Sequence, residues 1–309
     1  MPGSIDFDLV DFSGNPMENG VASIYRNMSI NSNVDLTEAE AIMDICILAS
    51  GGFSNCFLLV VFFHHGTMHT NTTSYLVSLF LSNLVILFGI LGEVLKTFVD
   101  ESYDLDLDYV AFVTFEASIV TLTIFSLDRY VVFCRRTTWV CRTLSKTSTA
   151  VKAVLFIWSL ASMFSAMELH LYAQFRRETI AYVFAGSTFV FLALPTMVIL
   201  SLQGLVIYEF QRPGSLMRSA KTKDIECFLL LVGLTLGFFL TMVPNRIAQA
   251  AYYVDPSIHC LAFNINVCFL AAKLSPLVMP LVCAIAWKRF RKAAKETLRD
   301  CRCRSHRDS

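Results

Sequence analysis

Residues 118–136, SIVTLTIFSLDRYVVFCRR, decide the fold of this chain. The stretch is a long apolar run that ends in Asp128, Arg129 and Tyr130 and is followed by two more arginines. Charged side chains are costly inside a lipid bilayer, so an apolar run that closes on them is typical of a membrane helix that reaches an aqueous boundary. The sequence therefore predicts a membrane helix whose end lies near Arg129 and meets a signalling protein.

The composition also favours a membrane protein. Of the 309 residues, 55% are hydrophobic and 16% are charged, whereas soluble domains carry about 25% charged residues. The formal net charge is +0, which gives no support to a nucleic-acid partner. We therefore expect membrane lipid, and no nucleic acid, among the partners.

Seven apolar segments are each long enough to cross a bilayer, which takes about 20 residues. None shows the alternation of a β-strand, and lipid admits only helices or closed barrels as spanning elements. The sequence therefore predicts an all-α membrane protein with a seven-transmembrane helix bundle over residues 41–286. The predicted spans are residues 41–63, 74–98, 109–133, 150–171, 180–208, 225–254 and 258–286.

The charges of the loops predict the orientation of the bundle. The loop after the second span, residues 100–108, is acidic, whereas residues 135–146 and 212–223, after the third and fifth spans, are basic. The positive-inside rule then places residues 1–40 outside the cell and the C-terminus inside. We expect a multi-pass protein of the plasma membrane, with a glycosylation sequon at Asn27 in the extracellular segment.

Residues 287–309 are predicted to form a short amphipathic eighth helix and a cytoplasmic tail. Residues 287–298, WKRFRKAAKETL, combine apolar residues at helical spacing with lysine and arginine, which favours a helix lying on an anionic membrane surface. Cys301 and Cys303 follow directly and are candidates for palmitoylation. The alternative is a solvated basic tail. The expected apolar face consists of Trp287, Phe290, Ala294 and Leu298.

Motifs spread over the seven spans resemble those of the rhodopsin-like (class A) G-protein-coupled receptors. The resemblance implies that Asp128, Arg129 and Tyr130 couple to a heterotrimeric G protein. Met242 and Cys283 stand where the family usually has a tryptophan and a tyrosine, which puts the usual activation relay in doubt. The matching residues are Asn55, Asn83 within LSNL, the triplet Asp128, Arg129 and Tyr130, Trp158, Pro195, Pro244 and Pro280.

Two further expectations come from this resemblance. In the family, the arginine of the triplet is tied at rest to an acidic residue at the base of the sixth helix, a position matched by Asp224. The alternative is that Asp224 is one of several charges in a basic loop. The family also has a sodium and water site that here would include Asn55, Asn83 and Ser118. Asn83 replaces the usual aspartate, so we expect weak sodium sensitivity.

Lys273 lies within an otherwise apolar segment, FLAAKLSPLVMP. An unpaired ammonium group there is costly, so it should be paired, deprotonated or covalently modified. In opsins, a lysine at this spacing from the seventh-helix proline forms a Schiff base with retinal, so the resemblance implies retinal as a possible cofactor. Glu93 is our first candidate for the counterion, ahead of Asp106 and Asp108. The alternative is an ion pair between Glu93 and Lys273 without a chromophore, or a lysine that faces a ligand cavity.

Glu116 strengthens the similarity to opsins, because many vertebrate visual pigments have a glutamate at the matching place beside retinal. The alternative for Glu116 is a protonated carboxyl group that is hydrogen-bonded to a backbone carbonyl or to a hydroxyl such as Thr114 or Ser187.

The favoured function is therefore a receptor that transmits light or an extracellular signal to a heterotrimeric G protein, with retinal on Lys273. The first alternative is a receptor of the same family for an extracellular peptide or lipid, with Lys273 in an ion pair. The second is a membrane transporter or channel. An enzyme is not expected, because the sequence has no Ser/His/Asp set, no metal-ligand spacing and no phosphate-binding loop.

Overall fold

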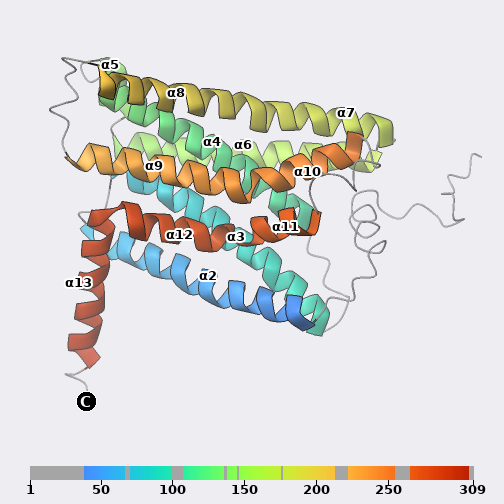
Figure 1. Cartoon of the computed structure of the whole chain (residues 1–309), viewed down its shortest axis with the longest axis horizontal. Helices are drawn as coiled ribbons and strands as arrows, with labels where there is room; N and C mark the ends of the chain where they lie inside the picture. Colours follow the sequence, from blue (N-terminus) through green and yellow to red (C-terminus); the bar gives the residue numbers. More distant parts are fainter. Residues whose placement is uncertain are drawn as a thin grey trace, which may run out of the picture.

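A computed structural model describes residues 38–66, 70–98, 107–135, 138–144, 146–174, 177–212, 222–254 and 265–305. All regular elements in these ranges are helices, which lie side by side as an elongated bundle while α13 turns across one end (Figure 1). The first four spans contain α2 (Glu38–His64), α3 (Asn71–Phe98), α4 (Leu107–Cys134) and α6 (Thr147–Gln174), with the short α5 (Trp139–Leu144) before α6. The last three spans contain α7 (Arg177–Thr188), η2 (Phe189–Ala193), α8 (Leu194–Gln211), α9 (Thr222–Thr241), α10 (Val243–Val254), α11 (Ile265–Lys273) and α12 (Ser275–Ala286). Helix α13 (Lys288–Ser305) follows the seventh span.

The predicted seven-transmembrane bundle is confirmed. Among the described residues, six helical spans are long and apolar enough to cross a membrane. A seventh is the pair Val267–Lys273 and Ser275–Ala286, which is bent by 51°. The predicted spans thus correspond to observed ones, although the sequence treats the last three as uninterrupted helices.

Each of the last three spans is interrupted two residues before a proline. The π-helical turn η2 ends before Pro195, the break between α9 and α10 falls at Met242 before Pro244, and the break between α11 and α12 falls at Leu274 before Pro276. A proline has no backbone N–H, and its ring collides with the carbonyl of the residue four places earlier. The helix therefore bends or widens just before the proline.

Two glycines bring α9 and α12 into close contact. A Cβ atom on Gly233 would lie 2.8 Å from Val282 Cγ1, and one on Gly237 would lie 3.0 Å from Val278 Cγ1. Small residues allow membrane helices to approach backbone to backbone, which is how they pack without a hydrophobic driving force. This packing holds α12, the segment of the seventh span after its bend, against α9 of the sixth span.

The eighth helix differs from its prediction. Helix α13 runs from Lys288 to Ser305 and so is longer than expected; it includes Cys301 and Cys303, whose palmitoylation stays a prediction. Trp287 and Phe290 are buried inside the protein and do not form a membrane-facing surface. Their rings lie 5.8 and 6.0 Å from the ring of Phe62. The aromatic residues of this segment therefore fasten α13 to α2.

Candidate functional site

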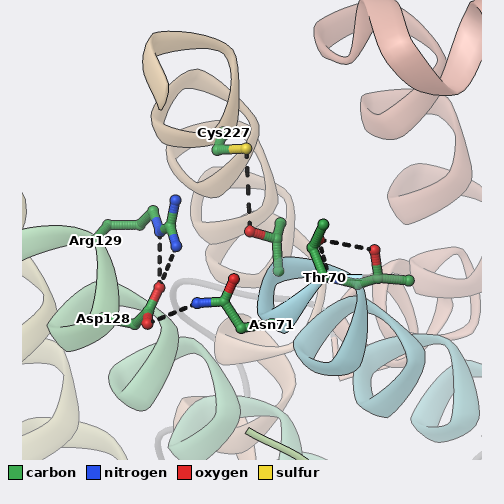
Figure 2. A network of polar contacts seen from close by, with 7 residues as sticks. Thr70, Asn71, Asp128, Arg129 and Cys227 are labelled. Atoms are coloured by element: carbon green, nitrogen blue, oxygen red, sulfur yellow. Dashed lines mark hydrogen bonds and ion pairs between the residues drawn. The ribbon is translucent and has the colours of Figure 1, made fainter. Parts of the chain in front are cut away.

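The first polar group lies where α4 ends, at what we call the Arg129 end of the bundle. Asp128 and Arg129 are both buried. Arg129 donates two hydrogen bonds to Asp128 Oδ2, one from Nε at 2.9 Å and one from Nη2, and Asn71 Nδ2 donates to Asp128 Oδ1 at 2.9 Å. Figure 2 shows these side chains between α4, α3 and α9, with Cys227 of α9 nearby. The pair is held by protein groups and is not solvated, contrary to the simple picture of a helix end in water.

Two other predicted switch residues lie near this pair. Tyr130 is partly buried and packs against a cluster formed by Phe133, Val206 and Phe228. Asp224 is in the first turn of α9 and contributes to the electrostatic environment of Arg129. A direct contact between Arg129 and Asp224 stays a prediction.

The second polar group lies in the middle of the bundle and includes two of the predicted network residues. Asn55 Nδ2 donates to Pro276 O at 2.7 Å, and Asn83 Nδ2 donates to Asn55 Oδ1 at 3.2 Å. Ser118 is buried, but within the described residues no hydrogen bond joins it to these asparagines. The asparagines therefore link α2 and α3 to the seventh span just beyond its bend.

The third polar group surrounds Lys273, the last residue of α11 before that bend. Lys273 Nζ lies 2.7 Å from Glu93 Oε2 of α3 and 2.8 Å from Asp44 Oδ2 of α2. The ammonium group also lies 4.8 Å from the centre of the Phe269 ring. We call Asp44, Glu93 and Lys273 the Lys273 cluster. The predicted pairing of Glu93 with Lys273 is present, and it is a charge-assisted hydrogen bond, which is stronger than one between neutral groups.

Asp44 is the member of the Lys273 cluster that the sequence analysis missed. The signal was available, because Asp44 is a carboxylate inside a predicted membrane span, and such residues are rarely without a role. The side chain of Asp44 is 1% exposed, whereas those of Lys273 and Glu93 are 13% and 24% exposed. Glu93 is therefore the most exposed member of the cluster.

A fourth group lies around Glu116, where the structure adds two ionisable residues that the sequence analysis did not name. Glu116 is accompanied by Glu168 of α6 and Arg246 of α10, and all three are buried. Arg246 Nη2 lies 3.1 Å from Glu168 Oε1. The carboxyl groups of Glu116 and Glu168 are near enough to interact electrostatically. We call Glu116, Glu168 and Arg246 the Arg246 cluster.

Hydroxyl groups and aromatic rings complete the Arg246 cluster. Ser165 Oγ donates to Glu116 Oε2 at 3.1 Å, and Ser187 Oγ donates to Glu168 Oε1 at 2.7 Å. The guanidinium carbon of Arg246 lies 4.7, 5.6 and 4.2 Å from the centres of three aromatic rings. A cation over aromatic faces is stabilised by their quadrupoles. The rings belong to Phe112, Phe115 and Phe184.

A hydroxyl group does bind Glu116, as the alternative interpretation expected, but it belongs to Ser165, while Ser187 donates to Glu168. Thr114 donates its hydroxyl to the backbone oxygens of Val110 and Ala111 in its own helix. A threonine inside a helix reaches the preceding turn more easily than a neighbouring side chain. Ser165, which does bind Glu116, lies on a different helix. Sequence spacing alone does not indicate which residue of that helix faces Glu116.

Some predicted residues are not placed. Asn27 and Asp106 lie outside the described residues, and the side chain of Asp108 is not described either. Glycosylation of Asn27 stays a prediction.

The chain is similar to known receptors. A family model described as "7 transmembrane receptor (rhodopsin family)" matches residues 54–282. The chain is also 26% identical, over 212 residues, to the Pyrokinin-1 receptor of Drosophila melanogaster. That alignment covers 60% of this chain and 48% of the relative, so the chain spans about half the length of the relative it matches.

Proposed function

Because the chain belongs to the rhodopsin family of seven-transmembrane receptors, we propose that it binds an extracellular peptide and passes the signal to a heterotrimeric G protein. Membership in this family makes the chain a multi-pass membrane receptor, which leaves no basis for the transporter and channel alternatives. The peptide is supported by the similarity to a receptor whose name refers to pyrokinin.

The observation that carries the proposal is the double pairing of Lys273. Its Nζ lies within 3 Å of both Glu93 and Asp44, so its charge is balanced by protein carboxylates without a chromophore. A lysine must lose its proton before its amine attacks an aldehyde, and two adjacent carboxylates oppose that loss. The retinal hypothesis stays a prediction, and the ion-pair alternative is the one that this geometry supports better.

The Arg129 end supports a coupling role of the kind that the family has. Arg129 is held by Asp128, whose other oxygen is held by Asn71 of the neighbouring helix. Releasing such a buried pair changes which groups reach the surface at this end, and two discrete arrangements of an ionic contact are a common switching element. We place the resting state in the arrangement with Arg129 turned toward Asp128.

The peptide proposal is tested in cells that express the receptor together with a panel of G proteins. The cells are exposed to a peptide library that includes pyrokinins, and G-protein activation is recorded. We expect at least one peptide to activate the wild-type receptor and not Arg129→Ala, with both proteins present equally at the cell surface. Activation by lipid extracts and by no peptide would contradict the proposal.

The retinal alternative has a separate test. The purified receptor is incubated with 11-cis-retinal in the dark, and a difference spectrum is recorded. We expect no absorbance beyond the band of free retinal. A red-shifted band that Lys273→Ala abolishes would establish the opsin hypothesis instead.

A further inference from the structure

The Lys273 cluster has one acceptor to spare. Lys273 gives hydrogen bonds to one oxygen of each carboxylate, and both contacts are short. The second oxygen of Asp44, Oδ1, is buried and has no hydrogen-bond partner. An ammonium group has three N–H donors, so the cluster can hold Lys273 in more than one way.

The two carboxylates differ in access. Asp44 is 1% exposed and Glu93 is 24% exposed, so Glu93 is the carboxylate with atoms at the surface of the protein. The positive-inside rule, applied to the loop charges, predicts that this end of the bundle lies outside the cell. Glu93 is thus the carboxylate that an extracellular ligand reaches.

We propose that Glu93 is the binding site for a basic side chain of the peptide ligand, arginine for preference, and that this side chain displaces Lys273 onto Asp44. The inference rests on the proposed peptide receptor function and names the chemistry of its ligand. A guanidinium group presents a planar fork of N–H donors that binds a carboxylate with two parallel hydrogen bonds, whereas Lys273 offers Glu93 a single ammonium group. The spare Asp44 Oδ1 accepts a second hydrogen bond from the displaced lysine, so the exchange leaves no charge unpaired.

Displacement of Lys273 would change how α11 is attached to the neighbouring helices. Lys273 is the last residue of α11, and the 51° bend of the seventh span follows at Leu274. Before the exchange, Lys273 ties α11 to both α2 and α3; afterwards it ties α11 to α2 alone. Beyond the bend, Pro276 O is held by Asn55 of α2. The ligand therefore changes the constraint on the segment before the bend while the segment beyond it stays fixed.

The test uses L-argininamide as a probe, with L-citrullinamide as its neutral analogue of nearly the same shape. Purified full-length receptor in lipid nanodiscs is titrated with each compound, and the rise in the midpoint of thermal unfolding gives an apparent Kd, because a ligand that binds the folded state stabilises it. We expect argininamide, and not citrullinamide, to raise the midpoint. Glu93→Gln should weaken argininamide binding about tenfold or more, as expected for loss of a charge-assisted contact.

Two further variants sharpen the test. Lys273→Gln should tighten argininamide binding, because the competitor for Glu93 is gone. Glu226→Gln is the matched control, since Glu226 pairs with Lys288 at 3.8 Å, away from the Lys273 cluster, and it should leave argininamide binding unchanged.

Two results would overturn the inference. One is an equal shift by argininamide and citrullinamide in the wild-type receptor, and the other is wild-type affinity for argininamide in Glu93→Gln. Because this measurement needs neither a natural peptide nor a G protein, its outcome is separate from that of the peptide screen. Binding of argininamide at Glu93 without any peptide response would sink the receptor proposal alone.

Discussion

The Lys273 cluster and the Arg246 cluster have the same chemical composition, two carboxyl groups and one basic group, but opposite surroundings. The Arg246 cluster is fully buried, with its guanidinium group among three aromatic rings and its carboxyl groups bound by serine hydroxyls. The Lys273 cluster is partly exposed through Glu93, and buried polar atoms with no hydrogen-bond partner among the described residues occur in both clusters.

This difference in surroundings separates a structural role from a responsive one. A buried pair cannot exchange its partner without exposing a charge to an apolar medium, so it fixes the helices that carry it. A pair that water reaches can exchange partners at low cost. We therefore assign the Arg246 cluster to holding α4, α6 and α10 together, and the Lys273 cluster to ligand recognition. The following substitutions test that division.

The largest effect is expected from Arg246→Met. Methionine fills the volume among the aromatic rings but leaves Glu168 buried without its cation, and removing one partner of a buried pair costs about 3–5 kcal/mol. We expect a large fall in surface expression and in the midpoint of thermal unfolding in nanodiscs. Arg212→Met is the matched control, because Arg212 is exposed and its salt bridge to Glu209 is 4.0 Å long. Equal behaviour of the two variants would remove the structural role of the cluster.

A smaller loss is expected from Glu168→Gln. The amide still accepts hydrogen bonds from Arg246 and Ser187, whose present distances to Glu168 Oε1 are 3.1 and 2.7 Å. It lacks the negative charge, and the charge-assisted part of such a bond contributes about 1.5–3 kcal/mol. The midpoint of thermal unfolding should therefore lie between that of the wild type and that of Arg246→Met. Glu296→Gln, on the exposed part of α13, should be indistinguishable from the wild type.

The sequence predicts the bundle well and its charged clusters only in part. The seven spans follow from apolar length, which the bilayer thickness dictates. The pairing of Glu93 with Lys273 followed from two charged residues on neighbouring helices of a known fold. The Arg246 cluster did not, because which residues of α6 and α10 face α4 depends on helix rotation, and the apolar spans give little indication of it. A census of charged residues within the predicted spans would have found Asp44, Glu168 and Arg246.

The helix breaks were similarly missed although their cause is in the sequence. Pro195, Pro244 and Pro276 each follow a break by two residues, and a proline inside an apolar run is a sufficient signal for a kink. Hydropathy averages over such a residue, so the spans were predicted as continuous. Of the three breaks, the bend beside Lys273 is the one that adjoins the proposed ligand site, the Lys273 cluster.

An intermediate effect, below that of Glu168→Gln, is expected from Lys273→Met. Two carboxylates then face each other, one of them buried, but Glu93 and Lys273 are partly exposed, so the loss should lie at the low end of the range for an unsatisfied buried group, about 1–2 kcal/mol. The midpoint of thermal unfolding of this variant should rise at lower pH, because protonation of one carboxyl group relieves the repulsion. Lys292→Met, an exposed lysine that pairs with Glu296 at 4.0 Å, is the control and should show no such pH effect. A loss as large as that of Arg246→Met would mean that the Lys273 cluster is as rigid as the other.

The smallest effect is expected from Glu116→Gln. Glu116 Oε2 accepts from Ser165, and Oε1 is buried with no hydrogen-bond partner, while the nearby Glu168 carboxyl group interacts with Glu116 electrostatically. Two buried carboxyl groups in contact are held together when one of them carries a proton, and a glutamine amide replaces that proton with an N–H donor. The free energy of unfolding of this variant should therefore lie within about 0.5 kcal/mol of the wild-type value, the range of a harmless substitution. Glu116→Ala removes the same carboxyl group without supplying a donor and should be clearly less stable. Equal instability of both variants would show that Glu116 is needed as a carboxylate, and the Arg246 cluster would then be an ionic site and not a closed structural one.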